Sequence, residues 1–165
     1  MITLGVDDQF QCVQLSDGSI IKLRVMDTAG QEKFNAINES YYKQADCCLL
    51  VYDITSMDSF KSIKNYYIKK IKEKCNNGLK VILLGNKTDL KDKRQITTEE
   101  GLKLAEKNGY IFMESSCKDN YNVSDAFTAL VEMTNTDIKK GIRKETSKKK
   151  GEKLKKSNHK NRKCC

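Results

Sequence analysis

Three clusters of polar side chains carry the residue types that could bind a small polar ligand. In chain order they are Asp27-Thr28-Ala29-Gly30-Gln31, Asn86-Lys87-Thr88-Asp89 and Ser115-Ser116-Cys117-Lys118. Their carboxylate, amide, hydroxyl and ammonium groups can accept or donate hydrogen bonds. Each cluster taken alone could be a turn or an ordinary polar loop. All three together, each placed after a predicted strand, favour one shared binding crevice.

The segments around these clusters predict five strands, at residues 10–15, 20–26, 45–54, 79–85 and 110–114. The first two are separated by Ser16-Asp17-Gly18-Ser19, which is typical of a hairpin. The next two are almost wholly apolar, as expected for strands buried on both faces. In an open parallel sheet, ligands bind beyond the carboxyl ends of the strands, so we expect the clusters to meet there.

Helical patterns alternate with the later strands. Apolar residues three and four positions apart predict one helix through Phe60, Ile63, Tyr67, Ile71 and Cys75. Thr97 and Glu100 have the spacing of a capping box, and the helix that they open should end at Asn108-Gly109. A last helix should reach Ile138. The alternation predicts an α/β fold, with a mostly parallel central sheet flanked by helices.

The charge of the chain is unevenly distributed. The 165 residues carry a net charge of +9. Residues 139–165 hold 13 basic and 2 acidic side chains, whereas residues 1–138 hold 18 basic and 20 acidic ones. We therefore predict a folded domain over residues 1–138 and a flexible Lys-rich tail over residues 139–165. A nearly neutral domain also argues against a nucleic-acid-binding face.

Composition excludes several other classes. No apolar run approaches the ~20 residues of a membrane-spanning helix, and the first residues do not resemble a secretory signal. The seven cysteines are irregularly spaced, which indicates neither a disulfide framework nor a zinc site. We expect a reducing, cytosolic environment. Four of the cysteines lie on predicted apolar faces and should be core residues: Cys12, Cys47, Cys48 and Cys75.

From residue 3 to about residue 138 the sequence resembles the Ras superfamily of small GTPases, and its Rab branch in particular. The stretches that carry the resemblance are residues 27–34, 40–42, 51–55, 84–90 and 114–118. Cys164-Cys165 after a basic tail also resembles a Rab ending. The resemblance implies a GTP-binding molecular switch of intracellular vesicle trafficking and protein transport, with GTP or GDP and Mg²⁺ as ligands. It also implies a monomer that does not bind nucleic acid.

The resemblance assigns the clusters individual roles. Asp89 would accept two hydrogen bonds from guanine, with Asn86, Lys87, Ser116, Cys117 and Lys118 enclosing the base. Thr3 and Asp27 would hold Mg²⁺, the latter through water, and Gly30 would donate its N–H to the γ-phosphate. Gln31 would be catalytic, since it would orient the attacking water.

One element of the family pattern is not found within these 165 residues. The phosphate-binding motif G-x-x-x-x-G-K-[ST] does not occur in them, because no glycine is followed by another five positions later. The family places a first strand between those predicted here at 20–26 and 45–54, and a first helix beside it. We therefore expect an incomplete G-domain fold that lacks its central strand. We also expect that the chain as written binds nucleotide no tighter than about millimolar, without measurable GTP hydrolysis.

The tail suggests a membrane location. By the resemblance, Cys164 and Cys165 would be prenylated by a Rab-type transferase, and the basic residues before them would add attraction to anionic lipid. We thus expect a lipid-anchored protein on the cytoplasmic face of an intracellular or plasma membrane, with a cytosolic pool. Rab-type prenylation and recycling factors, together with effectors, are the implied partners.

Three alternatives remain open from the sequence. The chain could be a fragment or an incomplete version of a working GTPase. It could instead be a nucleotide-independent, membrane-anchored module that occupies Rab partners. The Lys-rich tail could also serve nucleic-acid binding or nuclear targeting.

Overall fold

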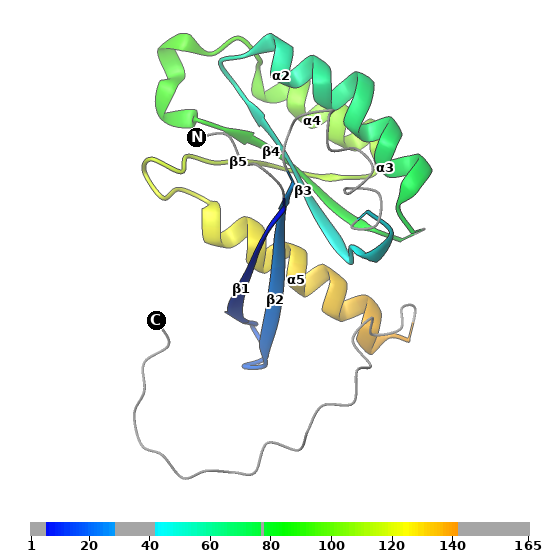
Figure 1. Ribbon diagram of the computed structural model, residues 1–165. Coiled ribbons are helices and arrows are strands. Elements are labelled where there is room, and N and C mark those ends of the chain that lie inside the picture. Colours follow the sequence, from blue (N-terminus) through cyan, green and yellow to red (C-terminus); the bar gives the residue numbers. More distant parts are fainter. Residues whose placement is uncertain (1–5, 29–41, 77, 142–165) are drawn as a thin grey trace.

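A computed structural model describes residues 6–28, 42–76 and 78–141. Thr3, Gly30, Gln31, Cys164 and Cys165 lie outside these ranges. Figure 1 shows the arrangement of the elements. In chain order they are β1 (Val6–Gln14), β2 (Ile20–Thr28), β3 (Cys47–Asp53), α2 (Met57–Ser62), η2 (Ile63–Tyr67), α3 (Ile68–Lys74), β4 (Lys80–Asn86), η3 (Thr88–Lys93), α4 (Thr98–Asn108), β5 (Ile111–Glu114) and α5 (Val123–Lys139).

The described strands form two sheets. β1 and β2 make the antiparallel hairpin that the sequence predicts, whereas β3, β4 and β5 lie side by side in parallel in that order. Within the described residues no ladder joins β2 to β3. Val51, in the middle of β3, is 47% exposed although its neighbours Leu50 and Tyr52 are buried. The lack of a central strand between β2 and β3 stays a prediction.

The main core lies between the parallel sheet and the helices α2, α3 and α4. Figure 1 shows these helices on one face of the sheet and α5 on the other. Tyr52 and Phe60 contribute aromatic rings whose centroids are 5.0 Å apart. Burying large apolar side chains of this kind is the main stabilising contribution to such a layer. The other buried members of the cluster are Leu50, Ile54, Ile63, Ile68, Ile71, Val81, Leu83, Ile96, Leu104 and Ala105.

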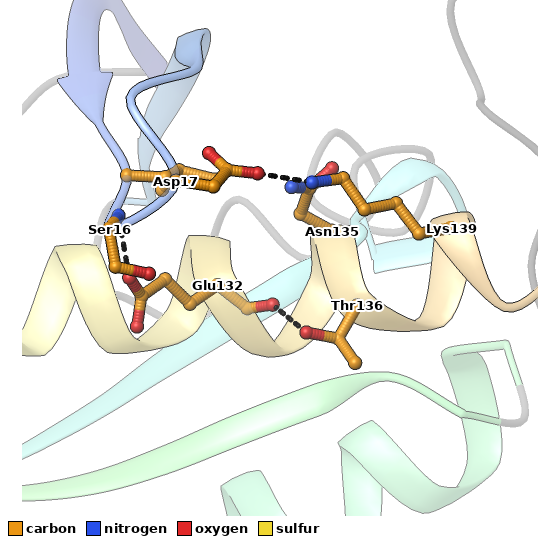
Figure 2. Close-up of a pocket in the computed structure, with 7 residues that line it drawn as sticks. Ser16, Asp17, Glu132, Asn135, Thr136 and Lys139 are labelled. Carbon is orange, nitrogen blue, oxygen red and sulfur yellow. Dashed lines mark hydrogen bonds and ion pairs between the residues drawn. The ribbon is translucent and has the colours of Figure 1, made fainter.

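The hairpin packs on α5 through a small cluster of its own. Val13 and Leu15 from the hairpin are buried against Val131 of α5. Polar contacts close the same junction, as Figure 2 shows: the Ser16 N–H donates to Glu132 Oε1 over 3.1 Å, and Asp17 pairs with Lys139. These groups line a pocket of about 140 Å³. Because the groups at its rim are paired with one another, this pocket is part of the docking of the hairpin.

The helix after β3 departs from the predicted α-helical spacing. Buried positions are Phe60, Ile63, Ile68 and Ile71, so Tyr67 is not in the deeply buried row and one interval is five residues long. The segment Ile63–Tyr67 is π-helical, and the Ile68 N–H donates to the Ile63 carbonyl. A π-turn accommodates one extra residue, which returns Ile68 to the side of the helix that Ile63 occupies. The prediction of one amphipathic helix is correct, but its uniform period is wrong.

The predicted ends of α4 are confirmed. The Thr97 hydroxyl accepts from the Glu100 N–H, and the Glu100 carboxylate accepts from the Thr97 N–H. Gly109 ends the helix at φ 69°, a left-handed conformation that glycine adopts without steric cost.

The cysteine prediction is wrong at one position. Cys12 is exposed, because it lies on the outer face of the hairpin, whereas Cys47, Cys48 and Cys75 are half-buried. Of these, Cys48 and Cys75 pack against the main core. Burial raises the pKa of the Cys48 thiol to about 12, as expected for a thiol that packs like an apolar side chain. Among the described helices, none has the length and apolar character needed to cross a bilayer.

Candidate functional site

The second and third polar clusters meet at the carboxyl ends of the parallel strands. Asp53 ends β3 and lies opposite Asn86, which ends β4. Gly85 lies opposite Glu114 at the end of β5. The strands therefore stop at the same level, and the loops that follow them start side by side. This is the position that the topology of a parallel sheet gives to a ligand site.

Hydrogen bonds join the two loops directly. The Ser116 hydroxyl donates to Asp89 Oδ1 over 2.8 Å. Asn86 Oδ1 accepts from the Ser115 hydroxyl over 3.2 Å and from the Cys117 N–H over 3.3 Å. Asn86 and Asp89, which belong to the cluster after β4, are thus each held by the cluster after β5. Because Ser115 and Ser116 are buried, these contacts are shielded from competing water.

The turn after Ser116 is closed by its own backbone. Ser116 and Tyr121 exchange N–H···O bonds of 3.1 and 2.9 Å, and the Asp119 N–H donates to the Ser116 hydroxyl. Asn120 and Asn122 adopt positive φ, which asparagine tolerates better than most residues. The turn therefore fixes the backbone around Cys117 and Lys118.

Asp89 is enclosed but keeps capacity to accept more hydrogen bonds. Its side chain is 10% exposed, and Lys118 Nζ lies 4.0 Å from its Oδ2. A carboxylate offers about four lone-pair sites, of which Ser116 occupies one. The remaining oxygen can therefore accept from a ligand that presents adjacent N–H donors. Guanine presents such donors and adenine does not, so the residues present fit a guanine base.

Lys87 combines an unusual backbone conformation with an ion pair. Its φ is 72°, in the left-handed region, and its Nζ lies 2.6 Å from Asp53 Oδ2. Burial alone would raise the pKa of Asp53, but hydrogen bonds from Lys87 and Thr55 outweigh burial and hold that pKa below its usual value. Strained backbone of this kind occurs often at binding sites, since the surrounding contacts must impose it.

Sequence reasoning missed two residues that support the site. Asp53 was not identified as the partner of Lys87. Arg94, which follows η3, pairs with both oxygens of Glu114 at 2.6 and 3.1 Å. This bidentate pair ties the segment after Asp89 to the end of β5, and it raises the pKa of Arg94. An Arg shortly after the Asn86–Asp89 loop and a Glu just before Ser115 were the available signals.

Of the first cluster, only Asp27 and Thr28 lie within the described residues. Asp27 is exposed and belongs to β2, opposite Asp7 of β1, so it lies within the strand and not after it as predicted. Gly30, Gln31 and Thr3 lie outside the described residues, so their predicted roles stay predictions. Within the described ranges, no group of three or more His, Cys, Asp or Glu side chains could hold a metal ion.

Comparison with known proteins decides the family. A family model described as the Ras family matches residues 1–136. The chain belongs to the Ras family. It is 44% identical over 128 residues to Ras-related protein Rab-8A of Gallus gallus, 45% identical to Rab-8B of Bos taurus and 44% identical to Rab-13 of Canis lupus familiaris. These relatives make it a Rab-type small GTPase by sequence, and its parallel sheet flanked by helices is that of a Ras-like G domain.

The likeness covers different shares of the two chains. The matched region is 78% of this chain, but 61% of Rab-8A of Gallus gallus and 62% of Rab-13. The chain therefore spans under two thirds of the length of these curated relatives. Family membership extends to this chain, whereas the activity of a whole Rab protein comes to it only as a proposal.

Proposed function

We propose that this chain is a guanine-nucleotide switch of the Rab type that acts in intracellular vesicle trafficking and protein transport. The observation that carries the proposal is the joining of two loops by the Ser116–Asp89 and Asn86–Cys117 hydrogen bonds. These contacts hold the Asp89 carboxylate beside backbone N–H groups at the end of a parallel sheet. That arrangement supports recognition of a base edge that offers donors to a carboxylate.

Each residue of the joined loops has a role in this proposal. Asp89 selects guanine through its unoccupied lone pairs. Asn86 fixes the position of the loop that follows β5. Lys87 lies along one side of the base with its ammonium group fixed by Asp53. Ser116, Cys117 and Lys118 close the other side.

The phosphate side of the proposal rests on the family. Thr3 and Asp27 would ligate Mg²⁺, which would neutralise phosphate charge when bound. Gly30 would donate its backbone N–H to the terminal phosphate, and Gln31 would orient water. A longer form of the protein that carried the phosphate-binding motif would hydrolyse GTP through Gln31.

The 165 residues alone should bind nucleotide weakly. Without that motif the phosphates lose most of their N–H and ammonium partners, so a few contacts to the base must offset the association cost. We expect a dissociation constant of about 1 mM, a binding free energy near −4 kcal/mol. Hydrolysis should not be measurable in this form, because nothing positions the phosphates.

The cellular setting is part of the same proposal. Prenylation of Cys164 and Cys165 would anchor the protein on the cytoplasmic face of a membrane, since two lipid chains anchor stably where one does not. Rab-type prenylation and recycling factors would exchange it with a cytosolic pool, and effectors would bind it there. The folded part would correspond to residues 1–138 and the tail to residues 139–165.

Isothermal titration of the purified 165-residue chain with GDP and with ADP tests the nucleotide proposal. We expect GDP to bind near 1 mM and at least about tenfold more tightly than ADP. Asp89→Ala should remove this preference. Equal affinities for the two nucleotides would contradict the base-recognition role of Asp89.

A further inference from the structure

One helix carries much more positive charge than the rest of the described domain. The continuous helix from Met57 to Lys74 contains six lysines and two acids, Asp58 and Glu73, a net charge of +4. Residues 1–138 as a whole have a net charge of −2. The positive charge is therefore concentrated on the helix formed by α2, η2 and α3, which lies on one face of the parallel sheet (Figure 1).

Four of these lysines form one row, and the π-turn aligns them. Lys61, Lys64, Lys69 and Lys72 each follow directly after one of the buried residues Phe60, Ile63, Ile68 and Ile71. The extra residue that returns Ile68 to the buried side therefore also returns Lys69 to the side of Lys64. All four lysines are exposed. We name them the lysine row; over eleven residues the row is roughly 16 Å long.

The charge of the lysine row is scarcely neutralised by neighbours. Lys69 has one contact of 3.9 Å with Glu73, and both side chains are more than half exposed. Exposed pairs of this kind contribute little. Lys72 donates to the uncharged side chain of Asn108 over 2.7 Å. No described acidic side chain pairs with Lys61 or Lys64, so the row keeps most of its charge.

Aromatic and basic groups beside the row extend the same surface. Lys70 Nζ donates to the Tyr66 hydroxyl over 3.3 Å and lies over the Tyr42 ring at 5.1 Å. The Tyr66 side chain is 38% exposed. A ring with a polar tip among long basic side chains is well suited to the boundary between water and lipid headgroups.

The lysine row lies on a helix whose C-terminal end, like that of α5, is on the side of the amino ends of the parallel strands. In parallel α/β units, helices run back toward the amino ends of the strands, so α3 ends away from the Asp89 loop. Lys80 at the start of β4 pairs with Asp137 in the last turn of α5 over 2.6 Å. Residues 139–165, which have a net charge of +11, therefore begin on the side of the amino ends of the strands.

We propose that the lysine row is a docking surface for an anionic lipid bilayer. A bilayer is favoured over an acidic peptide because the exposed row extends along the helix, and one extended anionic surface is complementary to both the row and the tail. Each lysine near such a surface contributes attraction that weakens with salt. The row adds to the proposed membrane anchor a defined face of the folded domain and needs neither lipidation nor nucleotide.

Sedimentation with vesicles tests this docking surface. The unlipidated full chain is mixed with vesicles of phosphatidylcholine containing phosphatidylserine, and with vesicles of phosphatidylcholine alone. The test variant changes Lys61, Lys64 and Lys69 to Gln. The matched control changes three exposed lysines elsewhere, Lys91, Lys93 and Lys103, and so removes the same charge.

We expect the test variant to lose about tenfold or more in partitioning to the anionic vesicles, and the control less than about threefold. Replacing the same three lysines of the row by Arg should preserve partitioning, since the charge is kept. Equal losses in both Gln variants, or no loss in the test variant, would overturn the proposal. The proposal would also be overturned if the test variant kept vesicle binding but no longer bound polyglutamate, an acidic peptide. That result would assign the row to an acidic protein partner.

Discussion

The Ser116 hydroxyl lies 2.8 Å from Asp89 Oδ1, so a residue that follows β5 holds a residue that follows β4. The same hydroxyl accepts from the Asp119 N–H over 3.1 Å. One buried side chain therefore fixes both the carboxylate that would read the base and the turn that would close over it.

Replacing Ser116 by Ala should destabilise the domain by about 1–3 kcal/mol, because Asp89 and the Asp119 N–H each lose a partner in a buried setting. The measurement is urea unfolding followed by circular dichroism. Ser62→Ala is the matched control, since the Ser62 hydroxyl only bonds the Asp58 carbonyl at an exposed site and should matter by less than about 0.5 kcal/mol. Equal losses of stability in the two variants would show that the Ser116 hydrogen bonds stabilise the domain no more than the exposed Ser62 bond does.

The Asp53–Lys87 pair predicts an acid-dependent contribution to stability. The pKa of Asp53 is lower in the folded state than its usual value, so the folded state favours the ionised carboxylate. This contribution is fully present above the usual pKa of Asp, about 3.9, and is lost as the pH falls through the lower folded value.

Asp53→Asn should therefore be less stable than the parent chain at pH 7. Below pH 4 the difference should shrink, because the parent loses the contribution that the variant lacks. Urea unfolding of both proteins between pH 7 and pH 3 measures this. A difference that stays constant over the whole range would contradict the assignment of the low pKa to Asp53.

Replacing Tyr52 by Phe should increase the stability of the domain. Its side chain is 1% exposed, and its hydroxyl has no hydrogen-bond partner among the described residues. Tyr52→Phe removes a buried unpaired polar group and should stabilise the domain by about 1 kcal/mol. The midpoint of thermal unfolding should rise accordingly; a lower midpoint would mean that the hydroxyl is hydrogen-bonded.

The neighbourhood of Tyr52 has no room for extra atoms. A Cβ at Gly101 would clash with the Tyr52 hydroxyl oxygen and would lie 2.5 Å from the Phe112 ring. Gly101→Ala should therefore cost about 1–3 kcal/mol despite the better helix propensity of Ala. In the Tyr52→Phe background the cost should be smaller, which a double-mutant cycle can show.

The π-turn predicts an unusual tolerance to deletion. Removing Asn65 would change the spacing of the buried residues from three, five and three to three, four and three, which suits a regular α-helix. We expect this variant to fold with a thermal midpoint close to that of the parent. Deleting Lys103 from α4, which has no such extra residue, should strongly destabilise the domain. If the two deletions were equally damaging, the extra residue would not be what the π-turn accommodates.

Much of this architecture follows from local sequence patterns. The Asp17-Gly18 turn, the apolar strands and the Thr97–Glu100 capping box each depend on nearby residues, and the structure contains all of them. The meeting of the second and third clusters also followed, because the ends of parallel strands share one edge of a sheet.

What the sequence did not predict depends on packing between distant residues. Nothing local shows that Lys87 turns toward Asp53 or that Arg94 pairs with Glu114, since each partner belongs to another element. The π-turn was missed because Tyr67, four residues after Ile63, satisfied the usual helical spacing while Ile68 took the buried position. Cys12 was misplaced because a hairpin strand has two faces and only one packs on α5.

Selection of guanine by the two joined loops can be tested by nuclear magnetic resonance at the residues concerned. Backbone amide signals of the 165-residue chain would be followed during titration with GDP and, separately, with ADP at millimolar concentration. We expect GDP to shift the signals of Lys87 to Asp89 and Ser116 to Lys118, and ADP to leave them nearly unchanged. If both nucleotides moved these signals equally, or neither did, the proposed base site would be wrong.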